Sequence, residues 1–194
     1  MFQKLILPAL VWLLCGCHCL SARTYYLSPS GDDRNHGRSP ARAWRTLERA
    51  NAAVLRPGDR LLLEGGATFE GTLVIDQNDA GKRRKPLLIK SFGDGLATIY
   101  NCGGRGILIH NTSGVRVEHL EVRGGGIGQC SSSANGIECL TSDSTRRHSG
   151  LVIDHCRVSG FGLYGILVNA EHSPRCGFDG VEITRCRVWE NGEA

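Results

Sequence analysis

The stretch VEITRCRV, at residues 181–188, repeats a pattern that occurs twice earlier in the chain. The earlier copies are LVIDHCRV at residues 151–158 and, more weakly, VRVEHLEV at residues 115–122. A second series of apolar segments, each beginning with Gly-Ile, alternates with the first and occupies residues 106–109, 136–139 and 165–168. One such unit cannot bury its apolar side without a neighbour. Two strand families that recur together therefore predict a solenoid of stacked coils.

The composition is typical of short strands joined by tight turns. The 194 residues include 26 Gly but only one Met, and the hydrophobic share is 41%. The net charge of +4 is mild, and no recognised nucleic-acid-binding motif accompanies it. We therefore expect no nucleic-acid partner.

Residues 1–22 have the features of an export signal. Lys4 supplies a positive charge, an apolar run follows from Leu5 to Leu14, and a small-x-small cleavage site ends at Ser21. We therefore expect a secreted, periplasmic or cell-surface protein. A bacterial lipoprotein signal with Cys17 as the lipidated residue is an alternative, and an uncleaved anchor is another. Unless the chain is lipid-anchored at Cys17, we expect no membrane partner.

Removal of this signal would leave six of the nine Cys. Three of the six fall at inward positions of the repeat, where Cys behaves as a small apolar residue: Cys139, Cys156 and Cys186. The other three fall in turns: Cys102, Cys130 and Cys176. Cys102 and Cys130 each precede a Gly-Ile strand, so they could lie on adjacent coils and pair in an oxidising compartment. No Cys or His spacing suggests a zinc site.

Residues 23–60 predict a strand, a turn and a helix ahead of the coils. Ser39 and Pro40 provide a helix start, and apolar residues then recur at helical spacing at Trp44, Leu47, Ala50 and Val54. We therefore expect an amphipathic helix over residues 40–55. Its expected role is to cover the open end of the first coil, because an uncovered end exposes the core and a sheet edge.

Four segments resemble the amino-terminal region of secreted right-handed parallel β-helix proteins, the pectate-lyase-like superfamily. They are YYLSPSGDD at 25–33, WRTL at 44–47, PGDR at 57–60 and TFEG at 68–71. The resemblance covers residues 24–194 and implies an all-β fold, a right-handed parallel β-helix (solenoid) with a short N-terminal capping helix and coils over 61–194. It also implies a tight bend, where related proteins often stack Asn, at Leu120, Cys156 and Cys186.

The chain stops at Ala194, one strand group into a coil, with no segment to cover that coil. We therefore expect that C-terminal coils are missing and follow in a longer protein.

Strand alternation places candidate binding residues on the outer side of the Gly-Ile strands. We expect His110, Glu138 and Asn169 to point outward there. Two long loops follow these strands and would form a groove wall, and the resemblance implies a saccharide cleft on this side. The loop at 141–149 contains Arg146, Arg147 and His148, and the loop at 170–179 contains His172 and Arg175.

The resulting functional hypothesis is a carbohydrate-active extracellular protein that acts on an anionic polysaccharide by lyase-like β-elimination. A lyase needs a base and a cation beside the uronate carboxylate, the cation being Ca²⁺ or a basic side chain. The sequence identifies no catalytic residue and no cluster of Asp with calcium-site spacing. It also lacks the paired Asp of polygalacturonases, which argues against hydrolysis of that type. The alternative is a non-catalytic glycan-binding or adhesive surface protein.

Overall fold

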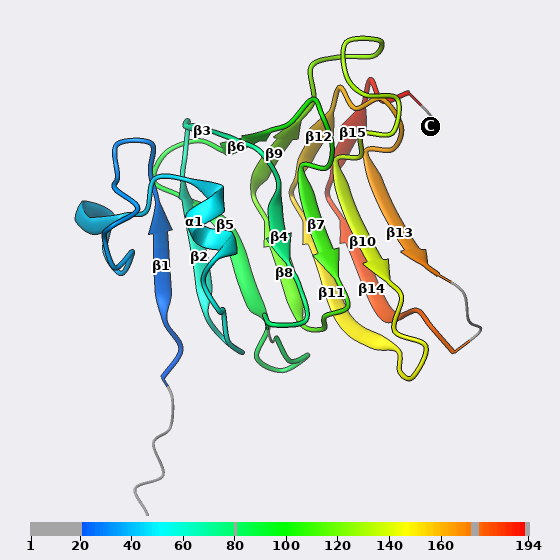
Figure 1. Cartoon of the computed structure of the whole chain (residues 1–194), viewed down its shortest axis with the longest axis horizontal. Coiled ribbons are helices and arrows are strands. Elements are labelled where there is room, and N and C mark those ends of the chain that lie inside the picture. Colours follow the sequence, from blue (N-terminus) through cyan, green and yellow to red (C-terminus); the bar gives the residue numbers. More distant parts are fainter. Residues whose placement is uncertain (1–20, 80, 172–174, 193–194) are drawn as a thin grey trace, which may run out of the picture.

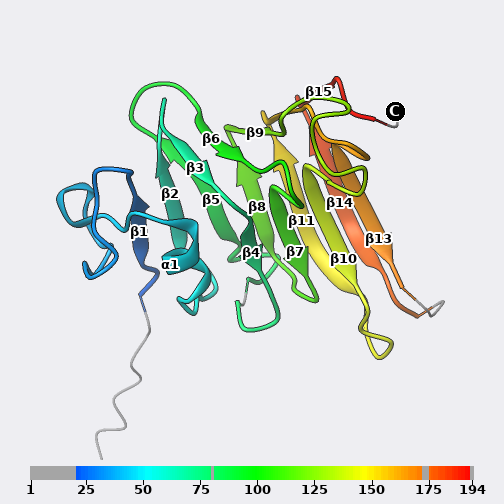
Figure 2. The ribbon, with the colours of Figure 1, turned by 45° about the horizontal axis from the view of Figure 1, so that its top comes forward.

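A computed structural model describes residues 21–79, 81–171 and 175–192 of the chain. They form three parallel sheets with almost no helix (Figures 1 and 2). Residues 1–20 lie outside the described part, and most of the predicted export signal with them. None of the described helices is long and apolar enough to cross a membrane.

The strands belong to three sheets, A, B and C. Sheet A contains β1 (Thr24–Leu27), β2 (Arg60–Glu64), β5 (Leu87–Phe92), β8 (Val115–Glu118), β11 (His148–Asp154) and β14 (Phe178–Thr184). Sheet B contains β3 (Thr68–Glu70), β6 (Ala97–Tyr100), β9 (Leu120–Arg123), β12 (Arg157–Ser159) and β15 (Arg187–Trp189). Sheet C contains β4 (Leu73–Ile75), β7 (Ile107–His110), β10 (Ile137–Thr141) and β13 (Ile166–Ala170).

Successive strands from β2 onward visit sheets A, B and C in turn. Each strand then pairs in parallel with its counterpart one coil later, as β4 does with β7 and β7 with β10. Both repeated series therefore mark strands of a stacked, coiled chain, as the sequence predicted. The right hand of the coil remains a prediction.

Inward side chains stack from coil to coil and form the core. Ile107 pairs in register with Ile137, and Ile109 with Cys139, and all four are fully buried. Each buried aliphatic side chain of this kind contributes roughly 1.5–3 kcal/mol relative to exposure. The stack is less complete in the last coil, where Val168, Ile183 and Val188 are 37%, 45% and 46% exposed.

The tight bend lies one residue earlier than the resemblance implied. Positive φ angles of 49°, 51° and 53° occur at His119, His155 and Arg185, whereas Leu120 and Cys156 are buried inward residues. A non-glycine residue in this region costs on the order of 1–3 kcal/mol. The two His rings stack with centroids 4.7 Å apart, and Arg185 donates to the buried Asp154 carboxylate. These contacts offset the backbone strain across neighbouring coils.

The predicted helix over residues 40–55 is wrong in length. The segment forms a 3₁₀ turn, η1 (Pro40–Arg42), and a short helix, α1 (Leu47–Asn51), with Trp44 between them. Trp44 is extended because its backbone N–H and C=O bond to the edge of β1, through Tyr26 and Ser28. A strand pairing therefore overrides the helical spacing at this point.

The N-terminal segment nevertheless covers open edges of the solenoid. β1 pairs with β2 and extends sheet A. The Asn51 side chain in α1 accepts from the Val74 N–H and donates to the Thr72 carbonyl, so α1 satisfies the free edge of β4 in sheet C. Leu47 and Ala50 are buried as predicted, but Val54 is 60% exposed.

Asp79 anchors the segment after α1 to the loop that follows β4. Its carboxylate accepts the Leu55 N–H at 2.8 Å and the Asp76 N–H at 3.4 Å, and Asp79 is 5% exposed. Burial raises the pKa of Asp79 to about 6. Desolvation outweighs the two hydrogen bonds there because a buried carboxylate loses the hydration of its charge.

The Asp79→Asn variant should lose part of the pH dependence of stability. Between pH 3.8, the ordinary pKa of the carboxyl, and about 6, the native wild type binds more protons at Asp79 than the unfolded chain. Its free energy of unfolding therefore falls as pH rises through this window, by up to about 3 kcal/mol. Urea unfolding at pH 4 and pH 7 should show this fall in the wild type and a smaller fall in the variant. The exposed Asp94→Asn is the control and should behave as wild type; identical pH dependence in all three proteins would contradict the assignment.

Cys102 and Cys130, whose pairing the sequence allowed, form a disulfide. The disulfide joins the turn after β6 to the loop after β9, on adjacent coils. The remaining described Cys are free, and Cys139, Cys156 and Cys176 are buried. Cys102 and Cys130 are 28 residues apart in sequence, so the crosslink restricts a sizeable loop of the unfolded chain.

Replacing both bridged Cys with Ala should lower the free energy of unfolding by roughly 3–4 kcal/mol, by the loop-entropy argument. A reductant should lower the melting temperature of the wild type and leave that of the double variant unchanged. Equal sensitivity to reductant in both proteins would show that the disulfide does not contribute.

Candidate functional site

The outer face of sheet C carries a regular array of half-exposed side chains. The strand register aligns Val74, Leu108, Glu138 and Leu167 in one row. A second row aligns His110, Leu140 and Asn169. Except for Glu138 and Asn169, these residues are partly exposed, so the face combines apolar and polar groups.

Glu138 points outward, as predicted, but it is only 4% exposed. Arg105 from the preceding coil donates to its carboxylate through Nε at 2.6 Å and Nη2 at 3.3 Å, and Asn135 Nδ2 donates at 2.7 Å. The Arg105 side chain remains 44% exposed. The ion pair therefore fixes a guanidinium at the border of the face while the carboxylate lies beneath it.

Hydrogen bonds continue this border along the turns between sheets B and C. Thr72 Oγ1 and Asn101 Nδ2 donate to the Arg105 carbonyl at 2.7 and 2.8 Å. One coil later, Asn135 Oδ1 accepts the Tyr164 N–H at 3.1 Å. We call the row of Thr72, Asn101, Arg105, Asn135 and Glu138 the B–C ridge. It is a continuous polar edge across successive coils.

The sequence predicted His148 in a loop, but it is the first residue of β11. Its side chain is 1% exposed, and burial lowers its pKa, with a further lowering from Arg146 and an opposing effect of Asp143. Nδ1 lies 3.2 Å from Ser113 Oγ, while Nε2 has no hydrogen-bond partner among the described residues. A neutral, enclosed imidazole of this kind does not reach a substrate, so we assign it a packing role.

The carboxylate of Asp143 accepts hydrogen bonds from neighbouring residues close to His148. Arg146 Nε donates to its carboxylate at 2.8 Å, and Thr145 donates to it through both backbone and side chain. These contacts lower the pKa of Asp143 to about 2, the Thr145 hydrogen bonds being the largest cause. The carboxylate lies 3.7 Å from His148 Nε2. His110 Nε2 lies 3.5 Å from Ser142 Oγ, beside Asp143. The structure thus brings three predicted residues, His110, Arg146 and His148, to one corner beyond the ends of the sheet C strands.

The other predicted residues do not join this corner. Arg147 bridges to the next coil, where it donates to the Asp179 carboxylate and to the Cys176 and Phe178 carbonyls, so it fastens a loop. Asn169 is exposed and accepts the Ala170 N–H. Arg175 is exposed, and His172 lies outside the described residues.

Three titratable groups near this face are engaged within the protein. Glu138 and Asp143 each accept several donors, and His148 is enclosed. Within the described ranges, no group of three or more His, Cys, Asp or Glu is placed to hold a metal ion. The accessible groups of the face are its half-exposed Leu side chains together with His110 and Asn169, and Arg105 and Arg146 lie at its borders.

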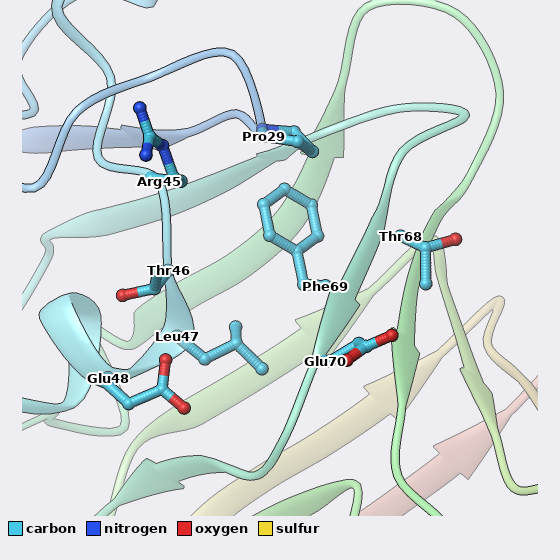
Figure 3. A pocket seen from close by; sticks show the side chains of 8 residues that line it. All are labelled: Pro29, Arg45, Thr46, Leu47, Glu48, Thr68, Phe69 and Glu70. Carbon is cyan, nitrogen blue, oxygen red and sulfur yellow. The ribbon is translucent and has the colours of Figure 1, made fainter.

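Sequence reasoning missed a hollow of about 330 Å³ between the start of α1 and β3 (Figure 3). Leu47 and Phe69 form its apolar part, and Arg45, Glu48 and Glu70 supply charges. Figure 3 places Glu48 and Glu70 on opposite sides of Leu47. The signal in the sequence is that each of the two Glu residues directly follows a buried apolar residue, in Leu47-Glu48 and Phe69-Glu70.

No protein-family model matches the chain. A stretch of 77 residues, 38% of this chain, is 39% identical to a lacto-N-biosidase of Bifidobacterium longum subsp. longum and spans 5% of that protein.

The structure resembles crystal structures of GH136 lacto-N-biosidase from Eubacterium ramulus. The selenomethionine derivative gives a TM-score of 0.67 at 19% identity, covering 86% of this chain and 34% of that one. The native protein gives 0.62 at 18% identity, covering 86% and 36%. A rhamnogalacturonan lyase is more distant, with a TM-score of 0.48. The chain thus spans about a third of the length of the GH136 structures, and what it shares with them is the fold.

Proposed function

We propose that this chain is part of an extracellular carbohydrate-active protein that holds a glycan along the outer face of sheet C. The observation that carries this proposal is the 39% identity to a lacto-N-biosidase over 77 residues. The fold similarity to a second lacto-N-biosidase supports the architecture. A right-handed coil belongs to the same proposal, since about 98% of parallel crossover connections are right-handed.

The face suits a sugar chain physically. Leu108, Leu140 and Leu167 are partly exposed and offer apolar contact to the C–H faces of sugar rings. On the B–C ridge, the half-exposed guanidinium of Arg105 offers donors to sugar hydroxyl groups, and Glu138 fixes it before any ligand arrives. Such preorganisation reduces the side-chain entropy lost on binding.

Hydrolysis is the reaction that we favour, because the relative at 39% identity carries the name lacto-N-biosidase, as do the GH136 structures. β-Elimination on an anionic polysaccharide, the expectation from sequence, is the second candidate. One observation favours it: the half-exposed guanidinium of Arg105 and the exposed one of Arg146 border the face, and a guanidinium can neutralise a uronate carboxylate.

Export from the cytoplasm is also part of the proposal. The apolar segment near Lys4 supports it, and so does the Cys102–Cys130 disulfide, because disulfides persist in oxidising compartments. Secretion, the periplasm and a lipid anchor at Cys17 remain alternatives within it.

Incubation with two glycans distinguishes the reactions. One is an oligosaccharide with a terminal lacto-N-biose unit, and the other is a uronate polymer. Hydrolysis should give products whose masses sum to substrate plus one water, whereas elimination adds no water and leaves a carbon–carbon double bond. Binding without product over long incubation would favour the non-catalytic alternative. Absence of both binding and product for every glycan would refute the proposal.

The Leu108→Ser variant should weaken glycan binding about five- to tenfold, since a smaller polar side chain loses apolar contact with the sugar. Leu88→Ser is the matched control, because Leu88 is an outward, half-exposed Leu on sheet A. Titration calorimetry on both variants, with melting temperatures to verify folding, makes the comparison. Equal losses in the two variants would place the glycan elsewhere.

A further inference from the structure

A hollow of about 440 Å³ lies beside β1 and α1, and none of its lining residues belongs to sheet C. In Figure 1 these elements lie at the left end of the solenoid, with β10 and β13 toward the right. The charged side chains that line the hollow are all arginines: Arg23, Arg38, Arg49 and Arg56. We call it the arginine hollow. Three other hollows, on sheet A and beside β3, each include at least one Glu.

The guanidinium groups of the arginine hollow form no ion pair with any acidic side chain that the structure describes. Across residues 21–79, 81–171 and 175–192, the arginines in ion pairs are others, such as Arg34, Arg105 and Arg185. The buried Asp59 carboxylate accepts the backbone N–H groups of Arg23 and Arg56, so it fixes the main chain. Four like charges around one concave surface raise the local positive potential and favour an anionic ligand.

Aromatic rings hold two of the guanidinium groups in place. Arg49 lies 4.5 Å from the Trp44 ring centroid and donates through Nε to the Asp33 carbonyl, and Arg38 lies 5.8 Å from the Tyr25 ring. The two rings stack 4.8 Å apart. Such contacts restrict the side chains, so less entropy is lost when their N–H groups bind oxygen.

We propose that the arginine hollow binds the carboxylate or sulfate groups of an acidic glycan, at a second site separate from the face of sheet C. Planar guanidinium groups match both oxyanions with paired hydrogen bonds. Val54, 60% exposed at the same hollow, offers apolar contact to a sugar ring. The choice of a glycan among polyanions rests on the proposed carbohydrate-active function.

The concave shape favours a glycan over a membrane surface. A lipid headgroup layer is contacted by protruding side chains, whereas these cationic groups line a recess. A flexible chain can enter such a recess and present several oxyanions to it.

The test compares two double variants that each remove two charges. Arg38→Gln with Arg56→Gln alters the hollow, and Arg42→Gln with Arg84→Gln alters exposed arginines outside it. Calorimetric titration of the complete chain uses a sulfated heparin oligosaccharide, an oligogalacturonate and a neutral oligosaccharide of equal length. The same titration with phosphatidylglycerol vesicles tests whether the hollow binds a lipid surface instead.

We expect an acidic oligosaccharide to bind the wild type, the hollow variant to bind it at least about tenfold more weakly, and the control to stay within about twofold. Any binding of the neutral oligosaccharide, at the sheet C face, should be the same in the wild type and in the hollow variant. Glycan binding at the sheet C face should be unchanged in the hollow variant. A protein that binds glycan at sheet C but not at the hollow would therefore contradict this inference and leave the proposed function intact. Equal weakening in both variants, no binding of either acidic oligosaccharide, or hollow-dependent binding of vesicles alone would overturn the inference.

Discussion

The parallel register between coils is the constraint on which the rest of this protein depends. Each inward residue of sheet C, such as Ile107, stacks on its counterpart one coil away, Ile137. A slip of one residue would turn every such side chain outward, because side chains alternate along a strand. The apolar rows therefore fix the coils relative to one another, and everything on the outside inherits that alignment.

The proposed glycan face follows directly from this alignment. The register that buries Ile137 and Cys139 also places Glu138 opposite Leu108 on the outer side. Arg105, in the turn of the preceding coil, then reaches the carboxylate. A charged group on a sheet surface is thus held by a neighbour about thirty residues away in sequence, and the pair lies in a fixed position before a ligand binds.

Buried charges and strained backbone angles occur where residues of neighbouring coils contact one another. The bends at His119, His155 and Arg185 have unfavourable φ angles, yet ring stacking and the Asp154 carboxylate connect them across coils. The arginine hollow differs, because aromatic rings hold two of its four guanidinium groups and no acidic side chain among the described residues pairs with them. This contrast is why the hollow suggests a ligand and the bends suggest only stability.

The sequence by itself determined the repeat, the strands of the coils and most of the inward residues, because periodicity and alternation are local properties. It allowed the Cys102–Cys130 pair but did not fix it. It did not determine the helix length at residues 40–55, where pairing of Trp44 with β1 overrode helical spacing. Nor did it reveal that Glu138 and His148 are enclosed, since their burial comes from side chains on other coils. Only the tertiary structure brought Arg23, Arg38, Arg49 and Arg56 to one hollow, because contacts between distant segments leave no periodic trace in the chain.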